Sequence, residues 1–129
     1  MTHPMPITEL IVCTTCRPQG VPRELPRAGA ALLEAVQVAQ FDRDPAERIA
    51  VRGVACMSGC DRACTVAFQA PGKNTYLFGD LQPDAETAAQ ILACARLHAT
   101  SADGALPRNA RPERLRSGIL VSLPAYVQP

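Results

Sequence analysis

Apolar residues recur along this chain in two different rhythms, which together predict its helices and strands. Over residues 25–40 they return every three or four positions, as on one face of a helix that packs against a core. These positions are Leu25, Ala28, Leu32, Ala35, Val36 and Ala39. A second helix is predicted to begin near Pro83, because proline suits the first helical position and the acidic Asp84 and Glu86 suit the first turn. Its apolar stripe comprises Ala88, Ile91, Leu92 and Ala95.

Four shorter runs carry the β-branched and aromatic residues that are typical of strands. They are residues 7–12, 48–55, 64–69 and 75–79, and a turn containing Gly72 separates the last two. The predicted order is strand, helix, strand, strand, strand, helix. This order makes an α/β domain of the thioredoxin-like arrangement, in which a strand–helix–strand unit is followed by a β-hairpin and a closing helix.

The composition changes after Thr100. Residues 101–118 are rich in Arg, Pro, Gly and Ala, and an apolar run follows them. The arginines of this segment are Arg108, Arg111, Arg114 and Arg116. We therefore divide the chain into a folded domain, residues 1–100, and an irregular Arg- and Pro-rich tail, residues 101–129. The tail is predicted to be flexible at first and then to dock as an extended segment.

Composition narrows the classes of function. The 129 residues suffice for one modest core, and 47% hydrophobic and 19% charged residues are ordinary for a globular protein. A net charge of +1 gives no support to a nucleic-acid or membrane partner. No apolar run approaches the roughly 20 residues of a membrane helix, and the first residues lack a basic start with an apolar stretch. We therefore expect a cytoplasmic protein, whose six cysteines are metal ligands or redox thiols rather than disulfides.

Two cysteine pairs follow two of the predicted strands. Cys13 and Cys16 come directly after the first strand, and Cys56 and Cys60 come after the second. A parallel crossover places the carboxyl ends of these strands side by side, so we expect the two cysteine loops to be neighbours. Four converging thiolates are the ligand set of a 2Fe–2S cluster or of a structural zinc ion. A single pair would be a weak signal, whereas two pairs closing the same unit are a strong one.

The two other cysteines are assigned weaker roles. Cys64 opens the third predicted strand, where we expect a core or near-core thiol that points away from, or behind, the ligand loop. The alternative is a further ligand that replaces Cys16. Cys94 lies about 120° around the second helix from its apolar stripe, taking about 100° per residue, and is predicted to be a thiol on the flank of the helix rather than a ligand.

Charged residues near the cysteines and helix ends complete the candidates. Arg17 follows Cys16 directly, and Arg62 lies close after Cys60. Either guanidinium can offset the charge of a thiolate cluster and raise its potential, and the alternative is a solvated side chain. His98 is predicted to cap the end of the second helix as a cation, and His3 is discounted as a ligand.

The segment "CMSGCDRACTVAFQAPGKNTYLFGDL" and the helix after it resemble the second half of the thioredoxin-like 2Fe–2S ferredoxins. In that family a C-x-x-x-C pair follows a strand, and a hairpin and a closing helix come next. The resemblance covers residues 7–99, and it implies a cluster-binding domain of thioredoxin-like ferredoxin fold. Its ligands would be Cys13, Cys16, Cys56 and Cys60.

The chain departs from that family at two points. The first pair of the family is usually spaced more widely than "CTTC", and Cys64 stands where the family often has proline. Taken with the Arg-rich tail, the whole pattern is most similar to a family of small predicted metal-binding proteins of unassigned function. Some members of that family are associated with cobalamin-synthesis genes.

Three functional hypotheses follow. The first is a small electron carrier, not an enzyme, whose surface-near 2Fe–2S cluster exchanges an electron with a partner reductase or oxidase. The second is a zinc-binding module or metal carrier that uses the same four cysteines. The third is a dithiol oxidoreductase that uses the pair Cys13 and Cys16, although the proline-rich loop after Cys16 delays the helix that would activate a thiol. The apolar end of the tail also favours a homodimer.

Overall fold

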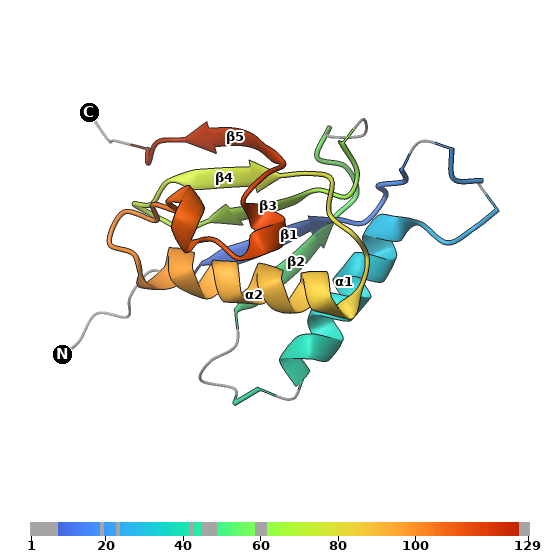
Figure 1. The fold of residues 1–129 in the computed structure, drawn as a ribbon, viewed down its shortest axis with the longest axis horizontal. Helices are drawn as coiled ribbons and strands as arrows, with labels where there is room; N and C mark the ends of the chain where they lie inside the picture. Colours follow the sequence, from blue (N-terminus) through green and yellow to red (C-terminus); the bar gives the residue numbers. More distant parts are fainter. Residues whose placement is uncertain are drawn as a thin grey trace.

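In the part of the chain that the structure describes, a five-stranded sheet is covered by two α-helices (Figure 1). The computed structural model describes residues 8–18, 20–22, 24–41, 43–44, 49–58 and 62–126. In chain order the elements are β1 (Glu9–Cys13), α1 (Ala28–Phe41), β2 (Ala50–Val54), β3 (Val66–Gln69), β4 (Thr75–Phe78), α2 (Ala85–Thr100), the 3-10 helices η3 (Arg108–Ala110) and η4 (Glu113–Leu115), and β5 (Ile119–Leu123). The predicted order is confirmed through α2.

The strands lie in the order β2-β1-β3-β4-β5. β1 and β2 are parallel, with Cys13 opposite Val54, and the other neighbouring pairs are antiparallel. The predicted crossover unit is therefore β1-α1-β2, and the predicted hairpin is β3-β4. Because β1 lies between β2 and β3, the loop that begins at Cys13 is flanked by β2 on one side and β3 on the other.

One buried cluster joins the sheet to both helices. From the sheet it takes Leu10, Val12, Val66, Phe68, Tyr76 and Phe78, and from the helices Leu32, Val36, Ala88, Ile91, Leu92 and Ala95. The helices contact each other, and Figure 1 shows α2 crossing in front of the sheet with α1 beside it. The apolar stripes predicted from the sequence thus face this core. None of the helices in the described ranges has the length and apolar character that a membrane crossing requires.

The beginnings of the two helices show how local sequence sets their bounds. α1 starts at Ala28 rather than at Leu25, because Pro26 disfavours a helical conformation of the residue before it. Leu25 is accordingly half exposed rather than part of the core. α2 starts after Asp84, whose carboxylate accepts a hydrogen bond of 2.7 Å from the Thr87 N–H and so caps the helix.

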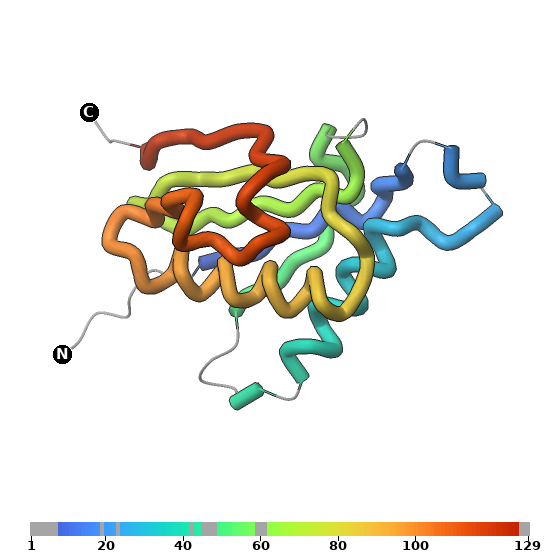
Figure 2. The backbone as a smooth tube through the Cα atoms, in the orientation of Figure 1, coloured from blue at the N-terminus to red at the C-terminus, as the bar shows by residue number. Residues whose placement is uncertain are grey.

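The segment after residue 100 packs as part of the same fold, in contrast to the separate tail drawn from its composition. Leu106 and Leu115 are buried in the core cluster, and the Leu106 N–H donates to the Tyr76 hydroxyl over 3.0 Å. β5 then extends the sheet by pairing with β4. Figure 2 shows the segment turning back and running beside α2 before it reaches the edge of the sheet. Burial of these two leucines fixes the segment to the core, although most of the residues around them are polar.

β5 is an edge strand with apolar side chains on its surface. Ile119, Val121 and Leu123 are between 39% and 54% exposed. The apolar run at the end of the chain thus lies along β4 as an extended strand, and pairing of the protein into a homodimer stays a prediction.

Candidate metal centre

The two cysteine segments meet at the carboxyl ends of β1 and β2, as predicted. The Thr14 N–H donates to the Val54 carbonyl over 2.8 Å, and the Thr14 hydroxyl donates to the same oxygen over 3.1 Å. The Thr15 hydroxyl donates to the Ala55 carbonyl. Parallel pairing of β1 with β2 therefore continues into the loops, and it places the Cys13–Cys16 loop directly beside the segment that carries Cys56.

Cys13 and Cys16 form a buried pair of thiols whose side chains hydrogen-bond to each other. They are 2% and 3% exposed. The first turn of α1 closes over their loop, because the Gly29 N–H donates to the Cys16 carbonyl over 3.1 Å. A Cβ at Gly29 would lie 2.0 Å from the Cys13 carbonyl oxygen, so only glycine permits this approach. The proline-rich loop thus lengthens the connection in sequence, yet the helix begins against the cysteines.

The two thiols of this pair differ in acidity. Burial alone would raise the pKa of Cys13, but hydrogen bonds from the Cys16 thiol and from the backbone N–H groups of Thr15 and Met57 lower it below the ordinary value. Burial raises the pKa of Cys16, and its bond to Cys13 raises it further. Of the two thiols, Cys13 therefore loses its proton more readily than Cys16 does.

Cys56 lies at the surface of the same site. Its side chain is exposed, and its sulfur accepts a hydrogen bond of 3.3 Å from the Ser58 N–H. The next residue, Met57, directs its N–H to the Cys13 sulfur, which ties the second cysteine segment to the first. Cys60 lies outside the described residues. Among the described residues, no three Cys, His, Asp or Glu side chains converge closely enough to hold a metal ion.

Cys64 lies behind the pair, on the core side. It is fully buried and belongs to the core cluster. Its neighbour Thr65 accepts a hydrogen bond of 3.1 Å from the Cys13 N–H, and the Thr65 hydroxyl lies 3.5 Å from the Cys16 sulfur. Burial, together with the charges of Cys16 and Cys13, raises the pKa of the Cys64 thiol to about 12. Cys64 is therefore a neutral thiol within electrostatic reach of the pair.

The two arginines near the cysteines are held by partners of their own. Nη2 of Arg17 donates to the Leu25 carbonyl over 3.2 Å. The guanidinium of Arg62 forms an ion pair with the Asp80 carboxylate, with Nε 2.8 Å from Oδ2. This pair is exposed, and it lowers the pKa of Asp80 through the hydrogen bond from Arg62. The positive charge of Arg62 is therefore partly offset by the Asp80 carboxylate.

Cys94 is a core residue, so the prediction that it lies on the flank of the helix is wrong. It is fully buried, and burial raises the pKa of its thiol to about 12. The cause is tertiary: η4 packs on α2, and Arg111 comes close enough to act on the Cys94 thiol. The side of the helix that was expected to face solvent is therefore covered by the segment after residue 100.

His98 is also buried rather than a cationic cap. Its Nε2 lies 2.6 Å from the Asn74 carbonyl oxygen, which can only accept, so Nε2 carries the proton. Its Nδ1 then accepts from the Thr8 hydroxyl over 2.7 Å. Burial lowers the pKa of His98, and the charge of Lys73 lowers it further. The cation at the end of α2 is instead Lys73, whose ammonium donates to the carbonyls of His98 and Ala99.

This polar network was missed in the sequence. Thr8, Asn74 and Lys73 are separated from His98 by turns and strands, and a lysine in a hairpin turn is normally a surface residue. The signal available was the position of Lys73 beside Gly72, in the tight turn that joins β3 to β4. His3 lies outside the described residues.

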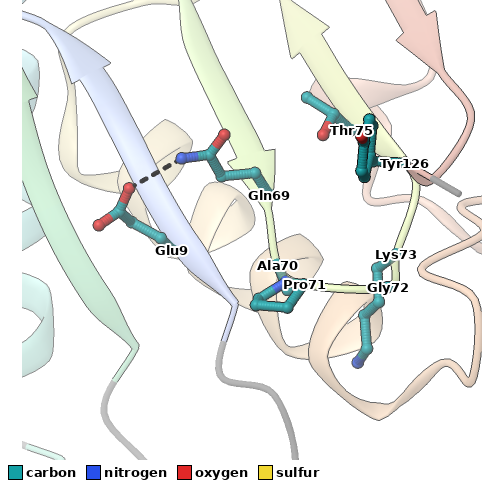
Figure 3. A pocket seen from close by; sticks show the side chains of 8 residues that line it. All are labelled: Glu9, Gln69, Ala70, Pro71, Gly72, Lys73, Thr75 and Tyr126. Atoms are coloured by element: carbon teal, nitrogen blue, oxygen red, sulfur yellow. Dashed lines mark hydrogen bonds between the residues drawn. The ribbon is translucent and has the colours of Figure 1, made fainter. Parts of the chain in front are cut away.

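A hollow lies at the opposite end of the sheet from the cysteines. It has a volume of about 460 Å³, and Figure 3 shows the residues that line it: Glu9, Gln69, Ala70, Pro71, Gly72, Lys73, Thr75 and Tyr126. Glu9 accepts from Gln69 over 3.0 Å and from Arg52 over 2.9 Å. Its carboxylate is therefore engaged within the protein, and no cysteine lines the hollow. The thiols make the cysteine end the better candidate for chemistry.

The sequence matches one protein family over nearly all of its length. Residues 10–125 match the family described as "Protein of unknown function (DUF1636)". The chain belongs to the DUF1636 family. No curated protein matches it.

The DUF1636 chain is also similar to a solved structure, a thioredoxin-like 2Fe–2S ferredoxin from Aquifex aeolicus. The sequences are 17% identical, the match covers 90% of this chain and 92% of the other, and the TM-score is 0.52. At this identity the similarity establishes the fold. The predicted thioredoxin-like ferredoxin fold is thus confirmed for this member of DUF1636.

Proposed function

We propose that this protein is a small iron–sulfur electron carrier whose 2Fe–2S cluster is bound where β1 and β2 end. The observation that carries the proposal is the meeting of the Cys13–Cys16 loop with the Cys56 segment, at the end of a parallel strand pair. The similar solved structure is that of a 2Fe–2S ferredoxin, and it shares this fold. The two supports are independent, because one is local geometry and the other is the fold as a whole.

The donor chemistry at this end fits thiolate-bound iron. The Cys13 sulfur receives backbone N–H groups from Thr15 and Met57, and these lower its pKa. The Cys56 sulfur receives the N–H of Ser58. Such N–H donors stabilise negative charge on sulfur and are one of the means by which a protein sets the potential of a cluster. The residues that would hold the cluster are Cys13, Cys16, Cys56 and Cys60.

When bound, a 2Fe–2S cluster supplies the exchange of one electron. The chain's own residues provide its surroundings. Cys13 and Cys16 are buried beneath the first turn of α1, which keeps water from that side, while Cys56 is exposed and marks the side open to solvent. We expect a partner reductase or oxidase to dock on the Cys56 side, because electron transfer requires a close approach.

Dithiol exchange is the hypothesis that the acidity of Cys13 would favour, since a lowered pKa marks a reactive thiol. Exposure argues against it. A nucleophilic thiol must reach a disulfide on another molecule, and Cys13 is only 2% exposed while Cys16 is 3% exposed. The low pKa of Cys13 is equally suited to a metal ligand, because the thiolate is the form that binds metal.

The deciding experiment is the visible spectrum of anaerobically purified protein, with assays for iron, sulfide and zinc. A red-brown protein with two irons and two sulfides per chain is the expected result. A colourless protein containing zinc would overturn the electron-carrier proposal and support the metal-binding module instead. A metal-free protein that reduces disulfides would support dithiol exchange.

Single Cys→Ser variants identify the ligands. Loss of iron and colour is expected for Cys13→Ser, Cys16→Ser, Cys56→Ser and Cys60→Ser. Cys94→Ser is the matched control, because Cys94 is equally buried but lies in α2, and it should keep its full iron content. Cys64→Ser is expected to keep the cluster as well. Loss of iron in Cys64→Ser together with its retention in Cys16→Ser would contradict the ligand assignment.

A further inference from the structure

A hollow of about 490 Å³ lies between the carboxyl half of α2 and the segment that forms η3 and η4. Figure 2 shows these two stretches, orange and red-orange, running beside each other. Three arginines line the hollow: Arg96, Arg111 and Arg116. Among the described residues that line it there is no carboxylate. The hollow therefore concentrates positive charge in a protein whose net charge is only +1.

Arg111 is the unusual member of this set. It is 6% exposed, and its guanidinium carbon lies 5.4 Å from the centre of the Phe78 ring. Its Nε and Nη1 atoms are buried and have no hydrogen-bond partner among the described residues. Burying a guanidinium without an anion is unfavourable, because the lost hydration is not replaced. The aromatic face offsets part of that cost, but it supplies no acceptor for the N–H groups.

Arg114, three residues further on in the same segment, has partners for its guanidinium group. Its guanidinium contacts the Thr87 hydroxyl at 2.9 Å, the Glu86 carboxylate at 3.2 Å and the Asp84 carboxylate at 3.4 Å. The acidic residues at the start of α2 are thus engaged by Arg114. Arg111 faces the other half of the helix, where the described lining offers no such group.

The surroundings of Arg111 are arranged in favour of an incoming anion. Nε of Arg116 donates to the Arg111 carbonyl over 3.0 Å, which holds a second guanidinium beside the first. The end of α2 would otherwise oppose an anion, because its free carbonyls carry negative partial charge. Lys73 binds two of those carbonyls, at His98 and Ala99, and neutralises this end of the helix.

Beside the arginines, the lining has two polar residues, Thr100 and Asn109, and an apolar part. Ala93 and Leu97 contribute from α2 and Pro112 from the facing segment, and Leu97 is 37% exposed. A purely inorganic anion would leave this wall uncovered. An anion that carries a small apolar group would bury it and would gain from both parts of the hollow.

We propose that this hollow is a binding site for a small organic oxyanion, a phosphate or carboxylate group attached to an apolar body. The anionic group pairs with Arg111 and Arg116, and the apolar body lies against Leu97 and Pro112. The site lies away from the cysteines and does not depend on the cluster. It is therefore tested independently of the electron-carrier proposal.

The test titrates full-length, isotope-labelled protein with phenyl phosphate, with benzoate and with inorganic phosphate, and follows the Arg111 Nε–H and Phe78 ring signals by NMR. We expect saturable binding of phenyl phosphate or benzoate below about 10 mM, with inorganic phosphate weaker. The tighter of the two organic probes identifies the anionic group. Absence of saturable shifts at Arg111 with either organic probe would overturn the proposal.

Variants separate a site from general attraction. Arg111→Met keeps the length of the side chain and should weaken binding about tenfold or more, since it removes charge-assisted hydrogen bonds. Arg116→Gln changes an exposed residue and should weaken binding about threefold without disturbing the fold. Arg108→Gln is the matched control: it removes the same charge from η3, outside the hollow, and should change binding less than about twofold.

Equal losses in Arg108→Gln and Arg116→Gln would show general attraction and overturn the proposal. Equal binding of phenyl phosphate and inorganic phosphate would overturn the role of the apolar wall. If circular dichroism shows that Arg111→Met does not fold, the comparison of binding by Arg116→Gln and by Arg108→Gln still tests the proposed site. Binding only of long polyanions, with no saturable small anion, would contradict a small-molecule site.

Discussion

The two ends of the central sheet bury polar groups in opposite ways. At the amino end of β1, each ring nitrogen of His98 has one partner, Thr8 or Asn74, and the Lys73 ammonium binds two helix carbonyls. At the carboxyl end, the buried sulfurs of Cys13 and Cys16 have each other and a few N–H and hydroxyl groups of the adjoining loops. At the amino end, the buried polar groups of His98 and Lys73 therefore have their hydrogen-bond partners within the protein.

The difference separates a structural network from a binding site. Buried nitrogen and oxygen atoms need hydrogen-bond partners within the fold. A network in which every such atom has a partner stabilises the fold and leaves no donor or acceptor free for a ligand. A thiol tolerates burial with weak partners, and as a thiolate it keeps its lone pairs for a metal. Changes at the amino end should therefore act on stability alone, whereas changes at the carboxyl end should act on the cofactor.

The largest effect is expected from Gly29→Ala. The added Cβ would lie 2.0 Å from the Cys13 carbonyl oxygen, which is backbone and cannot turn away. The first turn of α1 must then move off the cysteine loop. We expect a loss of about 3 kcal/mol or more in the free energy of unfolding, and less iron per chain, measured by urea denaturation and metal assay.

Gly72→Ala is the matched control at the amino end. No atom lies within 4 Å of its Cβ position, so only its φ of +73° is unfavourable. It should cost about 1 kcal/mol and leave the iron content unchanged. Full iron content and full stability in Gly29→Ala would contradict the packing of α1 on the cysteine loop.

His98→Asn is expected to have the next largest effect. The shorter side chain cannot reach both Thr8 and Asn74, so at least one buried group loses its partner. We expect a loss of about 2 kcal/mol at pH 7.5, measured by thermal or urea unfolding. Iron content should not change. A His98→Asn protein with wild-type stability but less iron would reverse the comparison between the two ends.

The same residue predicts a pH dependence. Burial lowers the pKa of His98 in the folded protein, so below its ordinary value of 6.5 the unfolded chain binds the proton more readily. The contribution of the neutral ring is therefore complete above about pH 6.5 and is lost as the pH falls further. Urea midpoints measured from pH 7.5 to pH 5 should decline in the wild type and decline less in His98→Asn. Parallel curves would contradict the assignment of a neutral His98.

Lys73→Met should have a smaller effect of the same kind. It removes the ammonium from the carbonyls of His98 and Ala99 but keeps the length of the side chain. We expect a loss of about 1–2 kcal/mol in the free energy of unfolding. Amide hydrogen exchange should rise in the last turn of α2 and not in α1. A uniform rise across both helices would show a general loss of packing instead.

The smallest effect is expected from Arg62→Gln. Arg62 lies next to the predicted ligand loop, but its guanidinium is exposed and paired with Asp80. We expect unfolding and iron content to stay as in the wild type, because exposed ion pairs contribute little to stability. Loss of iron in this variant would show that Arg62 supports the cysteine site directly.

Much of the fold and of the cysteine end was predictable, because both depend on local patterns. Apolar periodicity located α1 and α2, and alternating apolar runs located β1 to β4. The position of Cys13 and Cys56 at the ends of two parallel strands required only the geometry of a crossover. Errors arose where the segment after residue 100 intervened: it covers Cys94, and it brings Leu106 and Leu115 into the core.

The sequence by itself determined the order of elements and the placement of two cysteine segments at one end of a sheet, since hydrophobic spacing and chain direction are written into neighbouring residues. Only the tertiary structure decided which side chains are enclosed. His98 and Lys73 are enclosed by residues 24 and 25 positions away along the chain. Cys94 is covered by the segment after residue 100, and Arg111 lies over the Phe78 ring. Burial depends on which segment covers a residue, and the pattern of neighbouring residues in the sequence does not predict that segment.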